Sequence, residues 1–428
     1  MTTQRIALVL SGGGARGAYE LGVLSTLAPV LEARGERPGI IVGTSAGAIN
    51  AALLAAGAHL PLPEAVAHAT ATWRATRYEE VLGPLLSPRE LRRVLLYGLE
   101  LVGLPGAGLP SLLDAGPQAA GLTARVDFDR IARNVRGGAL HSVAAVATAY
   151  RTGRSVVFHH GGSAPGRDPV RGIDYVATRL DESHLRASAA IPVLFPAVEV
   201  VRPSRAAGWY GDGGTRLNTP LKPAIWLGAD RVVVIGLNAI GATGREGPVE
   251  RPDVFAGAAQ MLQAGLADQL AHDVATLVTV NRLLGGRSRE GHRPIPYIFI
   301  APSGVDSIGA AASEVWRAEF SGFRGLRRCR DLHLLGRILD VANSAQRGEV
   351  LSYLLFAPEF YDVMIDRGRA DAERWLAARP KDDPWRCEQL PGEAAPRRLP
   401  PLSSRSRPPS PRRARPSPPQ RAGTRARS

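Results

Sequence analysis

Cysteine is nearly absent from this sequence, because only Cys329 and Cys387 occur among its 428 residues. Two thiols are too few for a disulfide framework, and neither lies in a C-x-x-C or cysteine–histidine spacing that would hold a metal. A small secreted scaffold built on disulfides is therefore excluded. A reducing compartment fits this cysteine content best.

Charge is absent from residues 38–63, which contain no Asp, Glu, Lys or Arg. The run is long enough to cross a bilayer, but a turn of glycine and serine interrupts it, as does Asn50. A buried strand, turn and helix give the same hydropathy, and we predict that arrangement. The first five residues carry one basic side chain and no cleavage-site pattern, so we expect a strand to follow them and not a signal peptide.

Acidic residues are almost missing from the stretch 391–428, which holds ten arginines and one acid, Glu393. This tail therefore carries 10 − 1 = +9 of the net charge of +14, and the rest of the chain carries 14 − 9 = +5. Its Pro, Ser and Arg residues have little to bury, so we predict that it is disordered. A basic tail attracts anionic lipid or nucleic acid, but a solvated extension without a partner has the same composition. We predict no specific nucleic acid.

The remaining sequence has the pattern of a globular α/β protein, with 45% hydrophobic and 21% charged residues. An apolar run at residues 5–10 is followed by a glycine loop and a helix at 18–33, whose leucines recur at helical spacing. A second apolar run, 40–42, leads through a turn into helix-forming residues 48–56. This order predicts a three-layer α/β fold with a mostly parallel central sheet.

Strands and helices are expected to alternate up to about residue 300, and residues 313–378 are expected to be mostly helical. Further strands are predicted at 141–150, 155–160, 196–201, 231–237 and 297–302, and further helices at 63–77, 128–136, 181–190, 222–227 and 254–284. Residues 78–117 are rich in Leu, Gly, Pro and Arg. They form either an amphipathic cap over an active site or membrane, or ordinary packed surface helices.

The turn between the second strand and the second helix reads Gly43-Thr-Ser-Ala-Gly47, with Ser45 at the corner. In a G-x-S-x-G turn the glycines lack the Cβ atoms that would clash, so the serine Oγ projects outward. The same small residues also suit a tight crossing of helix and strand. The motif alone therefore leaves a nucleophile and a packing role equally open.

The first loop contains Gly12, Gly14 and Gly17 in the spacing G-x-G-x-x-G. A dinucleotide site would also need an acid at the end of the second strand, but the nearest one, Glu36, precedes that strand. A nucleoside-triphosphate loop is excluded because no Gly-Lys-Ser/Thr follows. Consecutive glycines beside a serine nucleophile instead offer N–H groups to an oxyanion.

A serine nucleophile needs a base, and Asp212 is the best candidate. It follows a predicted strand and is flanked by glycines that let the backbone approach its carboxylate closely. Among the nine histidines, only the pair His159 and His160 has a setting that resembles a strand-end loop with turn glycines. A carboxylate beside Ser45 can act as general base directly, although Asp-Gly-Gly is also a routine turn.

Together these segments resemble the patatin-like phospholipases, which are serine lipid acyl hydrolases with a Ser-Asp dyad. The resemblance covers roughly residues 5–240 and depends on four ordered blocks. The blocks are Ser11-Gly-Gly-Gly-Ala-Arg-Gly-Ala-Tyr-Glu-Leu-Gly-Val-Leu24, Gly43-Thr-Ser-Ala-Gly47, Ala187-Ser-Ala-Ala-Ile-Pro-Val-Leu-Phe-Pro196 and Asp212-Gly-Gly214.

The resemblance implies a three-layer α/β/α fold in which Ser45 is the nucleophile and Asp212 the base that activates it. It assigns the oxyanion hole to Gly12, Gly13, Gly14 and Arg16, and supporting positions to Gly17, Gly43, Gly47, Gly213 and Gly214. This chemistry needs no metal or organic cofactor, and the sequence holds no calcium ligand set. The implied substrates are membrane phospholipids or lysophospholipids, which suggests a cytoplasmic protein with peripheral membrane contact.

Three stretches are expected along the chain. Residues 1–240 would form the catalytic core, 241–390 the rest of the catalytic domain with a mostly helical extension, and 391–428 the tail. Two alternative functions stay open. One is a Ser-His-Asp esterase that uses His272 or His292, and the other is a non-catalytic lipid-binding or scaffolding protein of the same fold.

Overall fold

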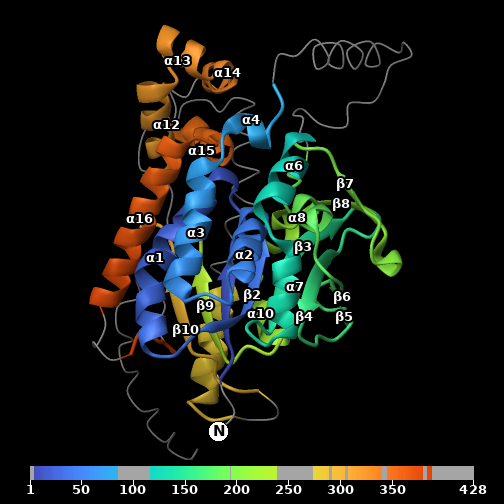
Figure 1. The fold of residues 1–428 in the computed structure, drawn as a ribbon. Coiled ribbons are helices and arrows are strands. Elements are labelled where there is room, and N and C mark those ends of the chain that lie inside the picture. Colours follow the sequence, from blue (N-terminus) through green and yellow to red (C-terminus); the bar gives the residue numbers. More distant parts are fainter. Residues whose placement is uncertain are drawn as a thin grey trace, which may run out of the picture. The chain divides into compact units, whose positions relative to one another are not determined.

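A ten-stranded sheet forms the centre of the structure, with the strand order β10-β9-β1-β2-β3-β4-β6-β5 and with β8 joined to β3 and β7 to β8 (Figure 1). The computed structural model describes residues 4–84, 116–192, 194–238, 273–288, 292–303, 307–339, 345–378 and 383–387. The strands are β1 Ile6–Leu10, β2 Pro38–Thr44, β3 Ser142–Ala149, β4 Ser155–Gly161, β5 Arg167–Asp168, β6 Ile173–Ala177, β7 Val198–Val200, β8 Gly208–Asp212, β9 Arg231–Ile235 and β10 Tyr297–Ile300.

Residues 273–284 form a helix. The labelled helices cover the sheet and make up most of the described chain after β10. They are α1 Ala18–Ala33, α2 Ala46–Ala56, α3 Leu62–Ala75, α4 Tyr78–Val81, α6 Gly116–Arg125, α7 Phe128–Arg136, α8 Glu182–Ser188, α9 Gly214–Leu217, α10 Leu221–Trp226, α12 Ser307–Glu319, α13 Gly322–Arg328, α14 Arg330–Ile338, α15 Ala345–Leu354 and α16 Pro358–Ala377. Short 3-10 helices, η1 and η2, span Gly14–Gly17 and Ser204–Ala206.

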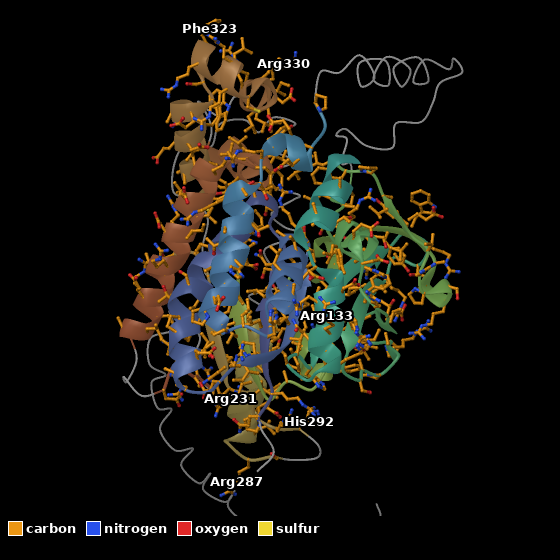
Figure 2. The ribbon with its side chains drawn as sticks, in the orientation of Figure 1. Arg133, Arg231, Arg287, His292, Phe323 and Arg330 are labelled. Carbon is orange, nitrogen blue, oxygen red and sulfur yellow. The ribbon has the colours of Figure 1, made fainter. Side chains whose placement is uncertain are left out.

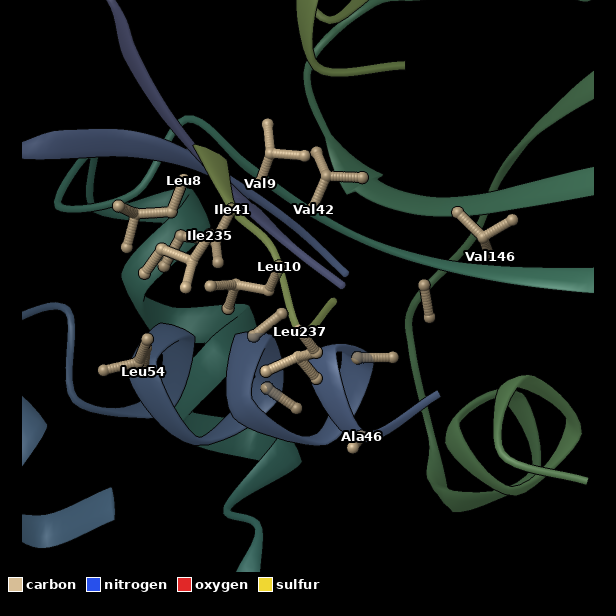
Figure 3. Packing of buried hydrophobic residues seen from close by; sticks show 14 of the residues in the cluster. Leu8, Val9, Leu10, Ile41, Val42, Ala46, Leu54, Val146, Ile235 and Leu237 are labelled. Atoms are coloured by element: carbon tan, nitrogen blue, oxygen red, sulfur yellow. The ribbon is translucent and has the colours of Figure 1, made fainter. Parts of the chain in front are cut away.

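The centre of the sheet is parallel, because β10, β9, β1, β2 and β3 all pair in parallel. Leu8 and Ile41 point toward α2, whereas Val9 and Val42 point away from it (Figure 3). All four side chains are buried, so the sheet is covered on both faces, as a parallel sheet requires. The predicted α/β fold with a mostly parallel sheet is therefore confirmed.

Most predicted elements agree with the structure to within a few residues. The helices expected at 18–33 and 128–136 have those bounds, and the helical region 313–378 is divided among five helices. The short strands β5 and β6 are not predicted from the sequence. Of the expected helix 254–284, residues 273–284 are helical and the rest lies outside the described residues, as do 85–115 and the tail.

The last helix packs directly on the first. A Cβ atom added to Gly22 of α1 would lie 2.1 Å from the carbonyl oxygen of Ile365, and one added to Gly368 of α16 would lie 2.2 Å from that of Tyr19. The Tyr19 hydroxyl also donates to Asp371 at 2.8 Å. Glycine thus lets two helices about 350 residues apart in sequence come into backbone contact. No helix in the described ranges is both long and apolar enough to span a bilayer.

Candidate active site

Ser45 lies in the turn between β2 and α2 and has φ 54° and ψ −123°. It is the only described residue other than glycine with a positive φ. A Cβ atom at Gly43 would lie 2.1 Å from the Gly47 oxygen, and one at Gly47 would lie 2.5 Å from the Leu10 oxygen. Both glycines are therefore required for this sharp turn, and the serine is held in a strained conformation.

A hydrogen bond from α8 holds this turn in place. The Ser45 N–H donates to Ser188 Oγ at 2.8 Å, and that hydroxyl donates in turn to the Val146 carbonyl at 2.5 Å. Ser188 belongs to one of the four sequence blocks, but its part in supporting Ser45 needs contacts that the sequence alone does not reveal.

Asp212 ends β8 beside Ser45 and is only 3% exposed. Its Oδ1 atom accepts the Gly214 N–H at 2.6 Å. Its Oδ2 atom is buried and forms no hydrogen bond of ordinary geometry with any described residue. Burial raises the pKa of Asp212 to about 6, although the nearby Ser45 side chain and the Gly214 N–H offset part of the rise. The two side chains are thus adjacent, and the contact between them is looser than a hydrogen bond of ordinary geometry.

The glycine loop runs past Ser45, since a Cβ atom at Gly12 would lie 3.1 Å from that of Ser45. The Gly12 N–H already donates to the Asn218 carbonyl at 3.2 Å. Among the described residues, no acceptor pairs with the N–H of Gly13 or Gly14. These two amides are therefore the ones that remain available to an oxyanion.

Arg16 is buried, and its guanidinium faces the C-terminal helices. Its Nε donates to Ser352 Oγ at 2.6 Å, and its Nη2 donates to the Glu349 carbonyl at 2.8 Å and forms an ion pair with the Glu349 carboxylate. Its Nη1 donates to Asn238 at 3.3 Å, and the group stacks on the Tyr353 ring. This arrangement ties α15 to the glycine loop, and it gives no support to the expected contact between Arg16 and an oxyanion.

A second buried acid, Glu20, lies under the loop. It accepts the Ser11 N–H at 2.6 Å and an Asn50 amide hydrogen at 2.8 Å, and Asn50 accepts from Trp73 Nε1. Burial raises the pKa of Glu20 to about 8, although the bonds from Asn50 and Ser11 lower it. This network joins the glycine loop to α2 and to α3. Gly17 completes the packing, because a Cβ there would lie 2.8 Å from that of Ala46.

Ser45 and Gly14 open into a pocket of about 760 Å³, which includes space open to solvent. Most of its walls are apolar and come from α2, α3, α6 and the segment after α8. The apolar lining consists of Ala46, Ile49, Leu53, Trp73, Val81, Leu122, Val126, Ala189, Ile191, Phe195 and Phe356. Arg125 and Glu80, which also line the pocket, form an ion pair at 2.7 Å. Ser45 thus opens onto a mostly apolar cavity, and most of the residues that line it belong to no sequence motif.

None of the described histidines lines this pocket. His184 belongs to the N-terminal cap of α8. Its Nδ1 atom lies beside Asp181, and its Nε2 atom bonds the Arg202 carbonyl. His159 and His292 line other pockets, and His272 lies outside the described residues. In the part of the chain that the structure describes, no group of three His, Cys, Asp or Glu side chains is arranged to hold a metal.

Comparison with known proteins adds one family and one fold likeness. Residues 8–225 match the model of the family described as patatin-like phospholipase. Among solved structures, the chain is similar to VipD from Legionella pneumophila, with 14% identity and a TM-score of 0.30, over 70% of this chain and 61% of that one. The chain thus spans about three fifths of the length of that structure. No curated protein matches.

Proposed function

This chain belongs to the patatin-like phospholipase family, a family of lipid acyl hydrolases, and on that premise we propose that it cleaves fatty acyl esters of phospholipids or lysophospholipids through Ser45 and Asp212. One observation carries the proposal: a strained serine lines an apolar pocket and lies beside a buried carboxylate, one oxygen of which has no hydrogen-bond partner among the described residues. In the sequence, the serine belongs to the G-x-S-x-G turn and the carboxylate to the Asp-Gly-Gly turn.

In the first step Ser45 Oγ attacks the ester carbonyl carbon while its proton passes to Asp212 Oδ2. The hydrogen bond from the Gly214 N–H engages Oδ1, and the carboxyl group also interacts with the Ser45 side chain, so we assign the proton to the other oxygen, Oδ2. A pKa of about 6 suits a general base at neutral pH, because the group is ionised there and more basic than an ordinary aspartate.

The tetrahedral intermediate carries its negative charge on the former carbonyl oxygen. We assign its stabilisation to the N–H groups of Gly13 and Gly14, which have no acceptor among the described residues, and the loss of one such donor typically costs about 3 kcal/mol of transition-state stabilisation. When the intermediate collapses, the alcohol portion of the lipid leaves with the proton from Asp212. A water molecule that Asp212 deprotonates then attacks the acyl-enzyme and releases the fatty acid.

The pocket explains why a lipid is the proposed substrate. A fatty acyl chain gains from burial against apolar walls, at roughly 0.8 kcal/mol for each methylene group. The walls beside Ser45 are formed by α2, α3 and α6, and their side chains include Ile49, Leu53 and Leu122. A short polar ester would leave this surface exposed, so we expect long acyl chains to be preferred.

The test is the release of free fatty acid from vesicles of mixed phospholipid and lysophospholipid. We expect Ser45→Ala and Asp212→Asn each to abolish release while the unfolding temperature stays close to that of the wild type. Ser25→Ala is the matched control, because Ser25 only bonds the Gly22 carbonyl within α1. Near wild-type release by either Ser45→Ala or Asp212→Asn would show the dyad assignment to be wrong.

A serine-directed fluorophosphonate probe separates the remaining alternatives. Labelling that disappears in Ser45→Ala supports the proposal, whereas no labelling of the folded wild type would favour a lipid-binding or scaffolding protein. If replacing His272 or His292 were as damaging as replacing Ser45, a Ser-His-Asp esterase would be the better description.

A further inference from the structure

Helices α13 and α14 present an unusual concentration of exposed apolar side chains, and we call residues 321–339 the α13–α14 hairpin. Phe323 is 74% exposed, Ile338 59% and Leu326 39%. Figure 2 shows Phe323 and Arg330 projecting at one end of the structure. Nine large hydrophobic side chains are exposed among the described residues, and three of them lie within this short segment.

The same hairpin is strongly basic. Residues 321–339 contain five arginines and one acid, so their net charge is 5 − 1 = +4. All five arginines are exposed and the acid, Asp331, is buried, but Arg328 forms ion pairs with Glu319 of α12 and Glu359 of α16. The Arg327 guanidinium lies 6.0 Å from the centre of the Phe323 ring. The exposed surface of the hairpin therefore combines apolar side chains with positive charge.

The exposure of these side chains does not result from loose packing. A Cβ atom at Gly336 would lie 2.1 Å from the Trp316 ring of α12, and one at Gly325 would lie 2.1 Å from the Phe320 backbone. The Trp316 Nε1–H donates to the Leu332 carbonyl at 2.8 Å. Close contacts on the inner side thus fix both helices and leave Phe323 and Ile338 facing outward.

The hairpin also contacts the rim of the substrate pocket. Cys329, at the junction of the two helices, donates from its Sγ to Glu79 of α4 at 3.3 Å. The next two residues of α4, Glu80 and Val81, line the pocket that contains Ser45. In Figure 1, α4, α6, α13 and α14 lie at the same end of the structure.

We propose that the α13–α14 hairpin docks the protein on an anionic lipid bilayer and thereby sets the pocket mouth against the membrane. Apolar side chains at this position enter the boundary between head groups and acyl chains, while arginines reach anionic head groups through their long stems. A protein partner could match the apolar residues, but the positive charge around them favours a negatively charged surface. The inference rests on the proposed function for the location of the substrate.

Binding to vesicles tests the docking surface without catalysis. The Ser45→Ala protein is sedimented with phosphatidylcholine vesicles, with and without phosphatidylserine, and the partition coefficient is measured. Adding Phe323→Asp and Ile338→Asp should lower partition onto the anionic vesicles about tenfold. Leu283→Asp is the matched control, because Leu283 is 75% exposed on the helix 273–284, which precedes Arg287 at the other end of Figure 2.

A second double variant tests the contribution of the hairpin's positive charge. Arg324→Glu with Arg337→Glu should lower partition onto the phosphatidylserine vesicles several-fold more than onto phosphatidylcholine vesicles, and the remaining binding should depend less on salt than that of the parent protein. The basic tail is present in every variant, so its own contribution cancels in these comparisons. The proposal would be overturned if the hairpin variants bound vesicles as well as the parent Ser45→Ala protein does. It would also be overturned if Leu283→Asp lowered vesicle binding as much as the hairpin substitutions do.

Two further measurements keep this proposal separate from the proposed function. Hydrolysis of a soluble short-chain ester by the hairpin variants with an intact Ser45 should stay within about twofold of wild type, because substitutions at exposed sites are usually mild. Failure of the wild type to hydrolyse any ester would contradict the proposed function and leave the binding result unaffected. If light scattering showed a dimer that only the hairpin variants disrupt, with vesicle binding unchanged, the surface would instead be a contact between copies of the chain.

Discussion

The carboxylate of Asp212 is the residue that should set the pH dependence of the reaction. Burial raises its pKa to about 6, and the proposed general base must be ionised to accept a proton. Activity should therefore be full above this pH and fall about tenfold for each unit below it, as protonation removes the base. The measurement is kcat/KM for a soluble ester across a pH series. A profile that stays flat down to pH 4, near the ordinary aspartate pKa, would contradict this role.

Sequence motifs were sufficient to select Ser45 and Asp212 as candidates, because a strand-to-helix turn and a glycine-flanked acid have local signatures. Long-range partners were not predictable in this way. The Gly12 N–H donates to the Asn218 carbonyl, and the Arg16 guanidinium bonds Glu349 and Ser352. All three partners lie more than 200 residues further along the chain. The site assignments themselves stay predictions until the variants are measured.

The contact between η1 and α15 is the clearest case in which an element far along the chain supports the site. Glu349 pairs with Arg16 and also accepts the Gly309 N–H at 2.8 Å. Glu349→Ala would leave the buried guanidinium without its counter-charge, so we expect a loss of about 3 kcal/mol in the free energy of unfolding. Urea denaturation measures this change.

The control for this variant is an ion pair on the surface. Asp362 of α16 pairs with Arg74 of α3 at 2.7 Å, and both side chains are 51% exposed. Asp362→Ala should change the free energy of unfolding by about 0.5 kcal/mol, because solvent screens such pairs. Equal effects of the two substitutions would show that the pair of Arg16 and Glu349 does not hold the loop.

Elements with strong periodicity were predictable, whereas short ones were not. The leucine spacing of α1 and the apolar runs of β1 and β9 are local signals, and the structure agrees with them. The two residues of β5 carry no such signal, since their pairing with β6 is what defines them as a strand. The division of 313–378 into separate helices depends on backbone breaks such as those at Gly322, where φ is 61°, and at Cys329, where the backbone is extended, and neither break has a strong signal in the sequence.

At the scale of the whole chain, we expect that the family-matched region 8–225 does not function by itself. It ends before β9, which pairs with β1, before β10, which pairs with β9, and before α16, which lies on α1. A chain that ends at residue 240 should therefore lose hydrolysis of a soluble ester, although it contains both Ser45 and Asp212. A chain that ends at residue 390 should retain it within about twofold, since the removed tail has little to bury. Purified fragments and a circular dichroism melt provide the measurement.

Activity in the fragment that ends at residue 240 would contradict this expectation and would make residues 1–240 an independent catalytic domain. Loss of activity in the longer fragment would instead assign a necessary role to the tail.

The contacts between Arg16 and α15 also affect when the site becomes complete during synthesis of the chain. A ribosome delivers the glycine loop first, and it delivers Glu349, Ser352 and Tyr353 only after more than three hundred further residues. Both Ser45 and Asp212 are present while 349 − 212 = 137 residues are still to be added before Glu349, and during this interval the chain lacks the contacts that fix the loop beside them. We expect the nascent protein to stay inert until its C-terminal helices emerge, so that the proposed hydrolysis begins only after α15 has been made.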